Sequence, residues 1–249
     1  MKKFGLIGHP LSHSFSQKFF TEKFNKENIT DCTYQNFSIP SINDISIILQ
    51  SEPDLKGLNI TIPYKEQIIP FLNFKNDVVE QINACNCIKI VDGKLYGYNT
   101  DVVGFEISLK KKLKPYHKQA LILGTGGASK AVQYVMKKLG IGYSLVSRKP
   151  SVNDMLSYKD LNESIIVSHL LIINTSPVGM YPNAEAYPEI PYGAITPQHY
   201  LFDLIYNPGK TTFLKKGEYQ GAAIENGLEM LVLQAEESWR IWNQGSPIS

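Results

Sequence analysis

A lysine stands just after the β-branched run Asn59-Ile60-Thr61-Ile62, separated from it by Pro63 and Tyr64. Successive side chains of a strand point to opposite faces, and a proline cannot extend the hydrogen-bonded ladder. The chain must therefore turn at Pro63, which places Lys65 on a loop just past a rigid strand. An amine held there can donate a proton and stabilise a developing negative charge. The alternative interpretation is a solvated surface lysine that follows a buried strand.

Four more polar side chains stand near the ends of predicted elements, and each has a chemical and a structural interpretation. The hydroxyls of Ser14 and Ser16 follow the first predicted strand and can bind a carboxylate at a helix N-terminus, or cap that helix. Asn86 stands within a predicted strand, where its amide needs a partner from a ligand or from the core. Asp101 ends the first half of the chain and can act as an acid or as a helix N-cap. Their joint occurrence favours a functional site.

A glycine-rich turn marks the second half of the chain. A buried strand predicted over 119–123 leads into Gly124-Thr125-Gly126-Gly127-Ala128-Ser129, and an amphipathic helix and a strand over 142–146 follow. Glycines at such a turn let a pyrophosphate approach the backbone, and the helix N-terminus favours its charge. Ser129 replaces the third glycine of the usual fingerprint, which affects helix–strand packing rather than the phosphate seat. The pattern predicts dinucleotide binding.

The tip of the next strand indicates which dinucleotide is bound. An acid there would bind the ribose 2′-hydroxyl of NAD, whereas an arginine would bind the 2′-phosphate of NADP. The chain has Arg148 followed by Lys149, and Arg148 stands 148 − 126 = 22 positions after Gly126, close to the expected spacing of about 20. The sequence therefore favours NADP, with an ordinary surface arginine as the alternative.

Composition indicates a globular protein and argues against several other classes. The 249 residues are 43% hydrophobic and 19% charged with a formal net charge of +2, a size and balance that suit two domains. No basic domain indicates a nucleic-acid partner, and the lysine-rich run 110–114 is better explained as a solvated helix face. No stretch is long and apolar enough to span a membrane, and the N-terminal apolar run is a strand rather than a leader. We therefore expect a cytoplasmic protein.

The three cysteines, Cys32, Cys85 and Cys87, form neither an even disulfide framework nor a zinc pattern. We interpret them as reduced residues that fill the core.

The order of elements predicts an α/β fold of two domains. In residues 1–100 short apolar strands alternate with amphipathic segments, which is typical of a mostly parallel sheet, and Asp92-Gly93 predicts an antiparallel hairpin near its end. The second half has the pattern of a Rossmann-type dinucleotide-binding domain. The strands expected in the first half span 4–7, 33–37, 57–62 and 84–90, with helices over 14–24 and 42–49.

Together these motifs resemble the shikimate dehydrogenase family, and the resemblance covers nearly the whole chain. The matching segments occur in the order of the family: the serine loop after the first strand, 59–65, 99–101, the glycine turn, 174–180, 203–208 and 226–235.

The resemblance implies a reversible, NADPH-dependent reduction of 3-dehydroshikimate to shikimate, a step of chorismate and aromatic amino-acid biosynthesis. It implies a substrate-binding catalytic domain of residues 1–101 plus 226–249, to which the last helix returns, and an NADP-binding domain of residues 102–225. The partners expected are the small-molecule substrates, with no nucleic acid and no membrane. A homodimer is left open.

The resemblance also assigns roles by position. Lys65 and Asp101 would be the catalytic pair. Hydride arriving at a ketone leaves an alkoxide, so the lysine can act as acid/base, as electrostatic stabiliser or as both. The substrate-binding residues would be Ser14 and Ser16 for the carboxylate, with Thr61, Lys65, Asn86, Asp101, Tyr206 and Gln234 for the rest of the molecule. The cofactor-binding residues would be Gly124, Gly126, Gly127 and Ala128 at the pyrophosphate, Ser147 and Arg148 at the 2′-phosphate, and Met180, Tyr206 and Gly227 at the nicotinamide. No metal is required.

Two departures from the family and two alternatives follow from the same residues. Gln17 replaces the proline that usually follows the second serine, and Ser147-Arg148-Lys149 stands where Asn-Arg-Thr is common. A quinate or quinate/shikimate dehydrogenase that uses NAD would keep the fold, but it is usually linked to an acid at position 148. A catalytically silent ligand sensor would lose the lysine–aspartate pair, and both residues are present.

Overall fold

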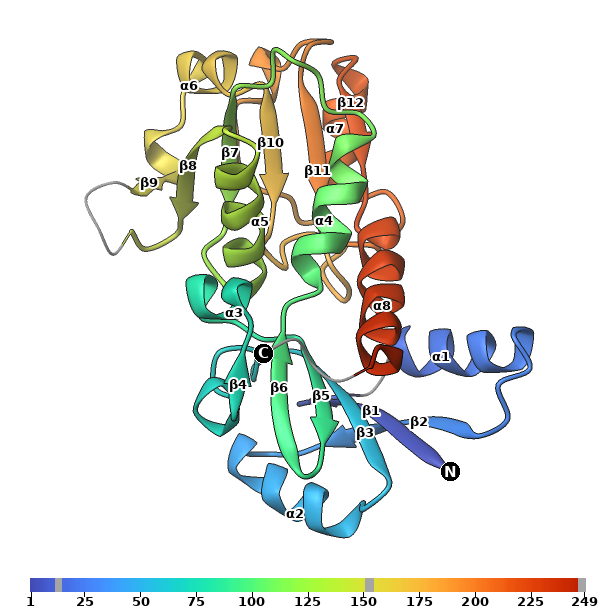
Figure 1. Ribbon diagram of the computed structural model, residues 1–249. Helices are drawn as coiled ribbons and strands as arrows, with labels where there is room; N and C mark the ends of the chain where they lie inside the picture. Colours follow the sequence, from blue (N-terminus) through green and yellow to red (C-terminus); the bar gives the residue numbers. More distant parts are fainter. Residues whose placement is uncertain (12–14, 151–154, 246–249) are drawn as a thin grey trace. The chain divides into compact units, whose positions relative to one another are not determined.

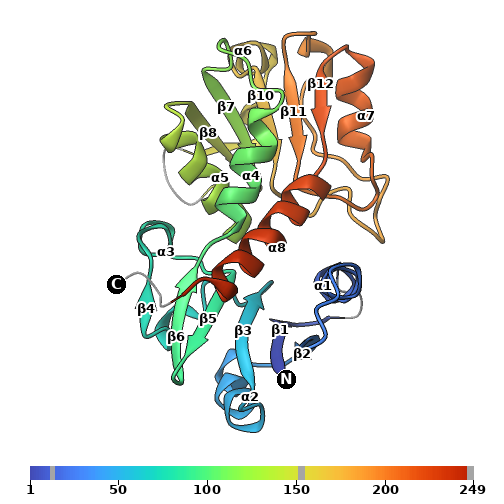
Figure 2. The ribbon, with the colours of Figure 1, turned by 45° about the vertical axis from the view of Figure 1, so that its right-hand side comes forward.

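The computed structural model describes residues 1–11, 15–150 and 155–245, which form two compact units (Figure 1). Unit 1 comprises Met1–Thr100 and Gln234–Ser249, and unit 2 comprises Asp101–Leu233. The second division falls inside the continuous helix α8, Leu228–Asn243 (Figure 2), whereas the sequence placed it before that helix. Which unit binds which ligand remains a prediction.

Unit 1 is built on a mixed sheet of order β2-β1-β3-β5-β6-β4. Strand β1 pairs in parallel with β2 and β3, and β4 pairs in parallel with β6. The predicted hairpin is present, since β5 and β6 are antiparallel and Asp92 and Gly93 both have positive φ. The strands are β1 Lys2–Gly8, β2 Cys32–Ser38, β3 Leu55–Ile60, β4 Phe74–Lys75, β5 Cys87–Val91 and β6 Lys94–Tyr98.

Both faces of this sheet are covered because its strands are apolar on both sides. Phe4 of β1 packs with an aromatic group that includes Phe20 of α1 and Trp242 of α8. Ile7 points to the other face and joins an aliphatic core with Ile45 of α2. The helices are α1 Phe15–Lys26, α2 Ile45–Ser51 and α3 Asp77–Ile82, with 3₁₀ turns η1 Ile42–Asp44 and η2 Ile69–Phe71.

Two expected boundaries in unit 1 were wrong. Strand β3 ends at Ile60 rather than at residue 62, because the chain already turns towards Pro63 and the Tyr64 amide donates to the Thr61 carbonyl. Strand β5 begins at Cys87, so Asn86 precedes the strand instead of lying within it. The Asn86 backbone still bonds to both neighbouring segments, since its carbonyl accepts from the Ile60 amide and its amide donates to the Tyr98 carbonyl, while its side chain accepts from the Thr100 amide.

Unit 2 contains a sheet of order β12-β11-β10-β7-β8-β9, and the strand pairings of its described residues are all parallel. Renumbered from β7, this is the strand order 3-2-1-4-5-6 of a Rossmann sheet, as predicted. The order reverses between β7 and β10, and sheets of this type bind their dinucleotide at the carboxyl ends of the strands beside such a reversal. The strands are β7 Gln119–Leu123, β8 Gly142–Ser147, β9 Met155–Ser157, β10 Leu171–Asn174, β11 Tyr200–Asp203 and β12 Ala223–Glu225.

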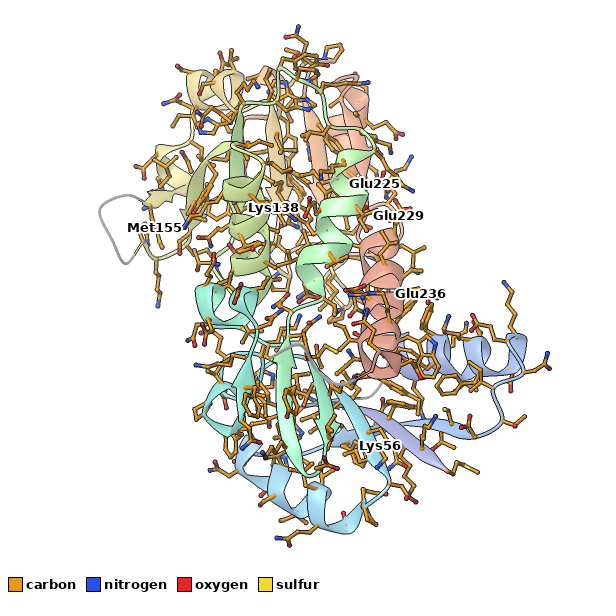
Figure 3. The ribbon with its side chains drawn as sticks, in the orientation of Figure 1. Lys56, Lys138, Met155, Glu225, Glu229 and Glu236 are labelled. Carbon is orange, nitrogen blue, oxygen red and sulfur yellow. The ribbon has the colours of Figure 1, made fainter. Side chains whose placement is uncertain are left out.

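Helices α4 and α5 lie side by side over one face of this sheet (Figure 1). Glu106 of α4 joins them, since its carboxylate pairs with Lys110 at 2.6 Å and with Lys138 of α5 at 2.7 Å (Figure 3). Burial raises the pKa of Glu106 but the two lysines outweigh it, and the pKa is lowered. The helices are α4 Asp101–Lys110, α5 Gly127–Lys138, α6 Glu163–Ser168, α7 Thr212–Tyr219 and α8, with 3₁₀ turns η3 Tyr158–Asp160 and η4 Tyr192–Ala194.

The lysine-rich run is more structured than a solvated face. Lys111 pairs with Glu229, and Lys112 pairs with Glu225 at 2.7 Å (Figure 3). These pairs fasten the end of α4 to β12 and to the start of α8. None of the helices in the described residues is long and apolar enough to cross a membrane.

Candidate active site

The lysine loop is held rigidly on both sides of Lys65, which lies just past β3 as the sequence predicted. The Thr61 amide donates to the Ile7 carbonyl at 2.9 Å, which continues the alignment of the strand into the loop. Tyr64 is buried, and its hydroxyl donates to the Ile39 carbonyl at 2.6 Å. The Lys65 carbonyl accepts from the Cys85 amide at 2.8 Å, so the backbone is fixed while the side chain is half-buried. The loop backbone that carries Lys65 is therefore fixed on both sides of the residue.

Asn86 and Gln234, two of the predicted substrate-binding residues, lie together around Thr100. The Asn86 Oδ1 accepts from the Thr100 amide at 2.6 Å, and its Nδ2 donates to the Thr100 hydroxyl at 3.0 Å. Gln234 Oε1 lies 3.4 Å from both Asn86 Nδ2 and Thr100 Oγ1. Asp101 follows directly as the buried first residue of α4. Thr100 therefore fixes the backbone next to the predicted catalytic acid.

The buried face of α8 includes polar residues that the period of apolar residues alone does not predict. Leu228 is 45% exposed, whereas Gln234 is 7% and Ser238 0% exposed. These polar side chains can be buried because they form hydrogen bonds with other buried polar groups. The sequence analysis missed Ser238 and also Tyr34. The hydroxyls of both residues bond to the side chain of Asn59. The available signal was the four-residue spacing of Ser238 from Gln234, which puts both on one helix face.

Ser16, the second predicted carboxylate ligand, is 9% exposed near the start of α1. Ser14 lies outside the described residues. The unusual Gln17 has a structural explanation, because its Oε1 accepts from Asn36 Nδ2 on β2 at 2.9 Å. Gln17 thus ties the start of α1 to the edge of the sheet.

The glycine turn exposes its backbone at the start of α5. Gly124 has φ +115°, and a Cβ there would lie 2.7 Å from Thr175 Oγ1. Backbone conformation and packing within the protein therefore both favour glycine at this position. Gly126 is the N-cap of α5, and a Cβ there would meet nothing within 4 Å. The backbone at Gly126 is therefore open to a ligand beside the N-terminus of a 12-residue helix. Ser129 is fully buried, as expected of a small residue that packs the helix on the sheet.

A buried carboxylate organises the loops after β10 and β11. Asp203 is fully buried, and it accepts hydrogen bonds from Thr211 Oγ1 at 2.6 Å, Asn174 Nδ2 at 3.0 Å and the Ile205 amide at 3.1 Å. Burial raises the pKa of Asp203 to about 6, against the opposite effect of these three donors. Asn174 in turn accepts from the amide and hydroxyl of Ser176. The segments that lead to Met180 and Tyr206 are both fixed by this group.

Met180 and Tyr206 are 47% and 37% exposed, so both can contact a ligand. Gly227 has a different reason to be glycine, because a Cβ there would overlap the Leu204 carbonyl oxygen. Its amide donates to the Ile205 carbonyl at 3.1 Å. Gly227 therefore lets the chain entering α8 approach the loop after β11, whether or not it also borders the nicotinamide.

Arg148 is exposed just past the end of β8, where a 2′-phosphate would be bound. The Ser147 hydroxyl accepts from the Lys149 amide at 3.2 Å and closes the turn. Burial raises the pKa of Tyr158, and the charge of nearby Arg148 opposes that rise. The residues 147–150 include no acid.

The cysteines are buried and free. Burial raises the pKa of Cys32 to about 11 and that of Cys87 further, so neither is a reactive thiolate. In the described part of the chain no three His, Cys, Asp or Glu side chains are grouped so as to hold a metal ion.

Comparison with known proteins gives consistent results. Residues 6–88 match the family model described as the shikimate dehydrogenase substrate binding domain. A shikimate dehydrogenase (NADP⁺) of Staphylococcus aureus strain Newman is 38% identical over 252 residues, which cover 96% of this chain and 92% of the relative. The chain belongs to the shikimate dehydrogenase family.

Solved structures of shikimate dehydrogenases share the fold. The crystal structure of shikimate dehydrogenase 1 from Peptoclostridium difficile is 39% identical with a TM-score of 0.81, covering 97% of this chain and 91% of that one. A Thermus thermophilus shikimate 5-dehydrogenase, solved with NADP(H) and shikimate, is 26% identical with a TM-score of 0.86, covering 98% and 94%. The family and the α/β fold class predicted from the sequence are confirmed. The roles of individual residues stay predictions.

Proposed function

We propose that this chain catalyses the reversible NADPH-dependent reduction of 3-dehydroshikimate to shikimate. The observation that carries the proposal is the 38% identity to a shikimate dehydrogenase (NADP⁺) over 96% of the chain. The lysine loop, the Asn86–Thr100 pair and the open glycine turn are compatible with this reaction. The names of the relatives favour NADP over the NAD-linked quinate alternative, and the presence of Lys65 and Asp101 argues against a silent ligand sensor.

In the proposed mechanism the residues of unit 1 bind the substrate. Ser14 and Ser16 hold the carboxylate, while Thr61, Asn86 and Gln234 bind the ring hydroxyls. NADPH, when bound, supplies the hydride to the carbonyl carbon. Lys65 stabilises the negative charge that develops on the carbonyl oxygen and gives that oxygen a proton, with Asp101 as its partner.

The cofactor is assigned to unit 2. Backbone amides at Gly126 and Gly127 and the N-terminus of α5 receive the pyrophosphate. Arg148, supported by Ser147, receives the 2′-phosphate through a charge-assisted contact. Met180 and Tyr206, whose loops Asp203 fixes, would line the nicotinamide pocket.

The proposal is tested by following NADPH absorbance after addition of 3-dehydroshikimate, with chromatographic identification of the product. We expect NADPH to be consumed in step with shikimate formation. The Asp101→Asn variant, which keeps the shape of the side chain, should lose most of this rate. A folded wild-type protein that forms no shikimate would overturn the proposal.

Two finer expectations remain sequence-based predictions. A homodimer would be seen by light scattering as twice the 28.0 kDa chain mass. A cytoplasmic location would be seen by fractionation of cells that express the full-length protein.

A further inference from the structure

Asn59 lies at the centre of a buried hydrogen-bond network in unit 1 that no substrate role explains. It is 4% exposed on β3, and its side chain joins three segments that are distant in sequence. Its Oδ1 accepts from the Tyr34 hydroxyl on β2 at 2.9 Å. Its Nδ2 donates to the Ser238 hydroxyl on α8 at 2.9 Å and to the Asn86 carbonyl at 3.2 Å.

The direction of the hydrogen bonds around Asn59 follows from its partners, whereas the contact between the Ser238 and Thr100 hydroxyls at 3.2 Å can run either way. The Asn86 carbonyl can only accept, so the Asn59 amide group faces it and the Asn59 oxygen faces Tyr34. Ser238 accepts from Asn59 and donates its own hydrogen to the Gln234 carbonyl at 2.9 Å. The order of donation is therefore Tyr34 to Asn59 to Ser238 to Gln234. A buried network in which every group is satisfied has one preferred arrangement, so it resists displacement of any member.

The network reaches the predicted carboxylate ligand Ser16 through Tyr34. The Tyr34 ring stacks on Phe20 of α1 with centroids 4.5 Å apart and planes at 17°. Ser16, four residues before Phe20 on the same helix, is a hydrogen-bond neighbour of the Tyr34 hydroxyl. Helix α1 is also fastened to α8, because Lys23 pairs with Glu236 at 2.8 Å (Figure 3).

We propose that Tyr34, Asn59 and Ser238 are positioning residues of the substrate site, which hold Ser16, Asn86 and Gln234 at fixed distances from one another without contacting the substrate themselves. Ser16 comes from α1, Asn86 from the segment before β5, and Gln234 from α8. Asn59 is bonded directly or through one further side chain to each of these segments. This inference rests on the proposed function, since it assigns a role to side chains around the same substrate.

The variants Tyr34→Phe and Ser238→Ala test the proposal because each removes one hydroxyl and keeps the packing. Matched controls are Tyr200→Phe and Ser108→Ala, whose buried hydroxyl oxygens have no hydrogen-bond partner in the described residues. The measurements are kcat, KM for shikimate, KM for NADP⁺ and the melting temperature. Each network variant should raise KM for shikimate by about 3- to 10-fold, the equivalent of one hydrogen bond, and leave KM for NADP⁺ unchanged. The controls should change neither KM.

The double variant Tyr34→Phe, Ser238→Ala separates a network from two local defects. Because either change releases Asn59, we expect its effect on KM for shikimate to be clearly smaller than the product of the single effects. An active wild type whose single variants keep the wild-type KM, or whose double variant shows the full product, would overturn the network and leave the proposed function standing. A wild type with no activity on shikimate would overturn both.

Discussion

The buried polar groups of the two units differ in charge. In unit 1, hydroxyl and amide side chains of Tyr34, Asn59 and Ser238 bond to one another behind the predicted substrate ligands. In unit 2, the carboxylate of Asp203 collects donors from Asn174 and Thr211 behind the predicted nicotinamide loops. Both arrangements join elements that are distant in sequence and fix the segments that carry functional residues.

The difference predicts where pH acts. Amides and aliphatic hydroxyls do not titrate near neutrality, and burial raises the pKa of Tyr34 well above its ordinary value. Asp203, with its pKa raised to about 6, changes charge within the range in which enzymes are usually assayed. Substrate positioning should therefore be insensitive to pH, whereas the stability of unit 2 should depend on it.

The variant with the largest expected effect is Lys65→Ala. It tests whether a charged side chain carries out the chemistry while the uncharged network of Tyr34, Asn59 and Ser238 only positions the substrate. Lys65→Ala should lower kcat by about 10²- to 10⁴-fold and change KM for shikimate little, because the amine acts on charge that develops in the transition state. Lys56→Ala is the matched control, an exposed lysine on β3 (Figure 3). If the Lys65→Ala variant kept more than half of the wild-type kcat, the assignment of Lys65 would be wrong.

Ser16→Ala should act on binding instead. A carboxylate remote from the reacting carbon is held alike in the ground and transition states, so KM for shikimate should rise more than kcat falls. A lost hydrogen bond to charge corresponds to roughly a 10- to 150-fold change. Steady-state kinetics at saturating NADP⁺ measure this, with KM for NADP⁺ as the internal control. An unchanged KM for shikimate would mean that Ser16 serves the helix and the Tyr34 contact alone.

On the cofactor side, Arg148→Ala should remove most of the preference for NADP over NAD. We expect the wild type to prefer NADP by roughly 10- to 150-fold in kcat/KM, the value of a charge-assisted contact. NAD use should hardly change, because its 2′-hydroxyl does not depend on the guanidinium. Lys137→Ala, an exposed cation on α5, is the control. Equal use of NAD and NADP by the wild type at low salt would refute this cofactor assignment.

The last prediction concerns Asp203 and the pH dependence of the free energy of unfolding. The folded state raises the pKa of Asp203 from 3.8 to about 6, so the stability gained from the neutral form is complete below pH 3.8 and is lost as pH rises through 6. Relative to Asp203→Asn, the wild type should lose up to about 3 kcal/mol of unfolding free energy between about pH 4 and 7. Urea denaturation of both proteins across this range measures the difference.

Tyr34→Phe serves as the neutral-network control for that experiment. Its stability difference from the wild type should stay constant across the same pH range, because the Tyr34 hydroxyl keeps its proton. A flat profile for Asp203→Asn, or a sloping one for Tyr34→Phe, would contradict the comparison between the units.

The sequence predicted the parts of the site that depend on local signals. Pro63 ends a strand and fixes where Lys65 lies, and the glycines after β7 define the turn into α5. These features follow from backbone chemistry within a few residues. The Rossmann-type domain was predicted from the alternation of strands and helices together with that turn.

The features that were missed depend on partners far along the chain. Asn86 was placed inside a strand, but β5 begins at Cys87, and the Asn86 side chain bonds to Thr100, 14 positions away. The burial of Gln234 could not be predicted from the period of apolar residues, because its buried polar setting comes from Asn86 and Thr100. Periodicity cannot reveal a partner 148 positions away.

The most direct test of the account is a spectrophotometric assay that crosses shikimate and quinate with NADP⁺ and NAD⁺. We predict that shikimate with NADP⁺ gives the highest kcat/KM of the four combinations. With NAD⁺ in place of NADP⁺ the value should fall by roughly 10- to 150-fold. Quinate with NAD⁺ as the best combination, or no turnover with shikimate, would contradict the account.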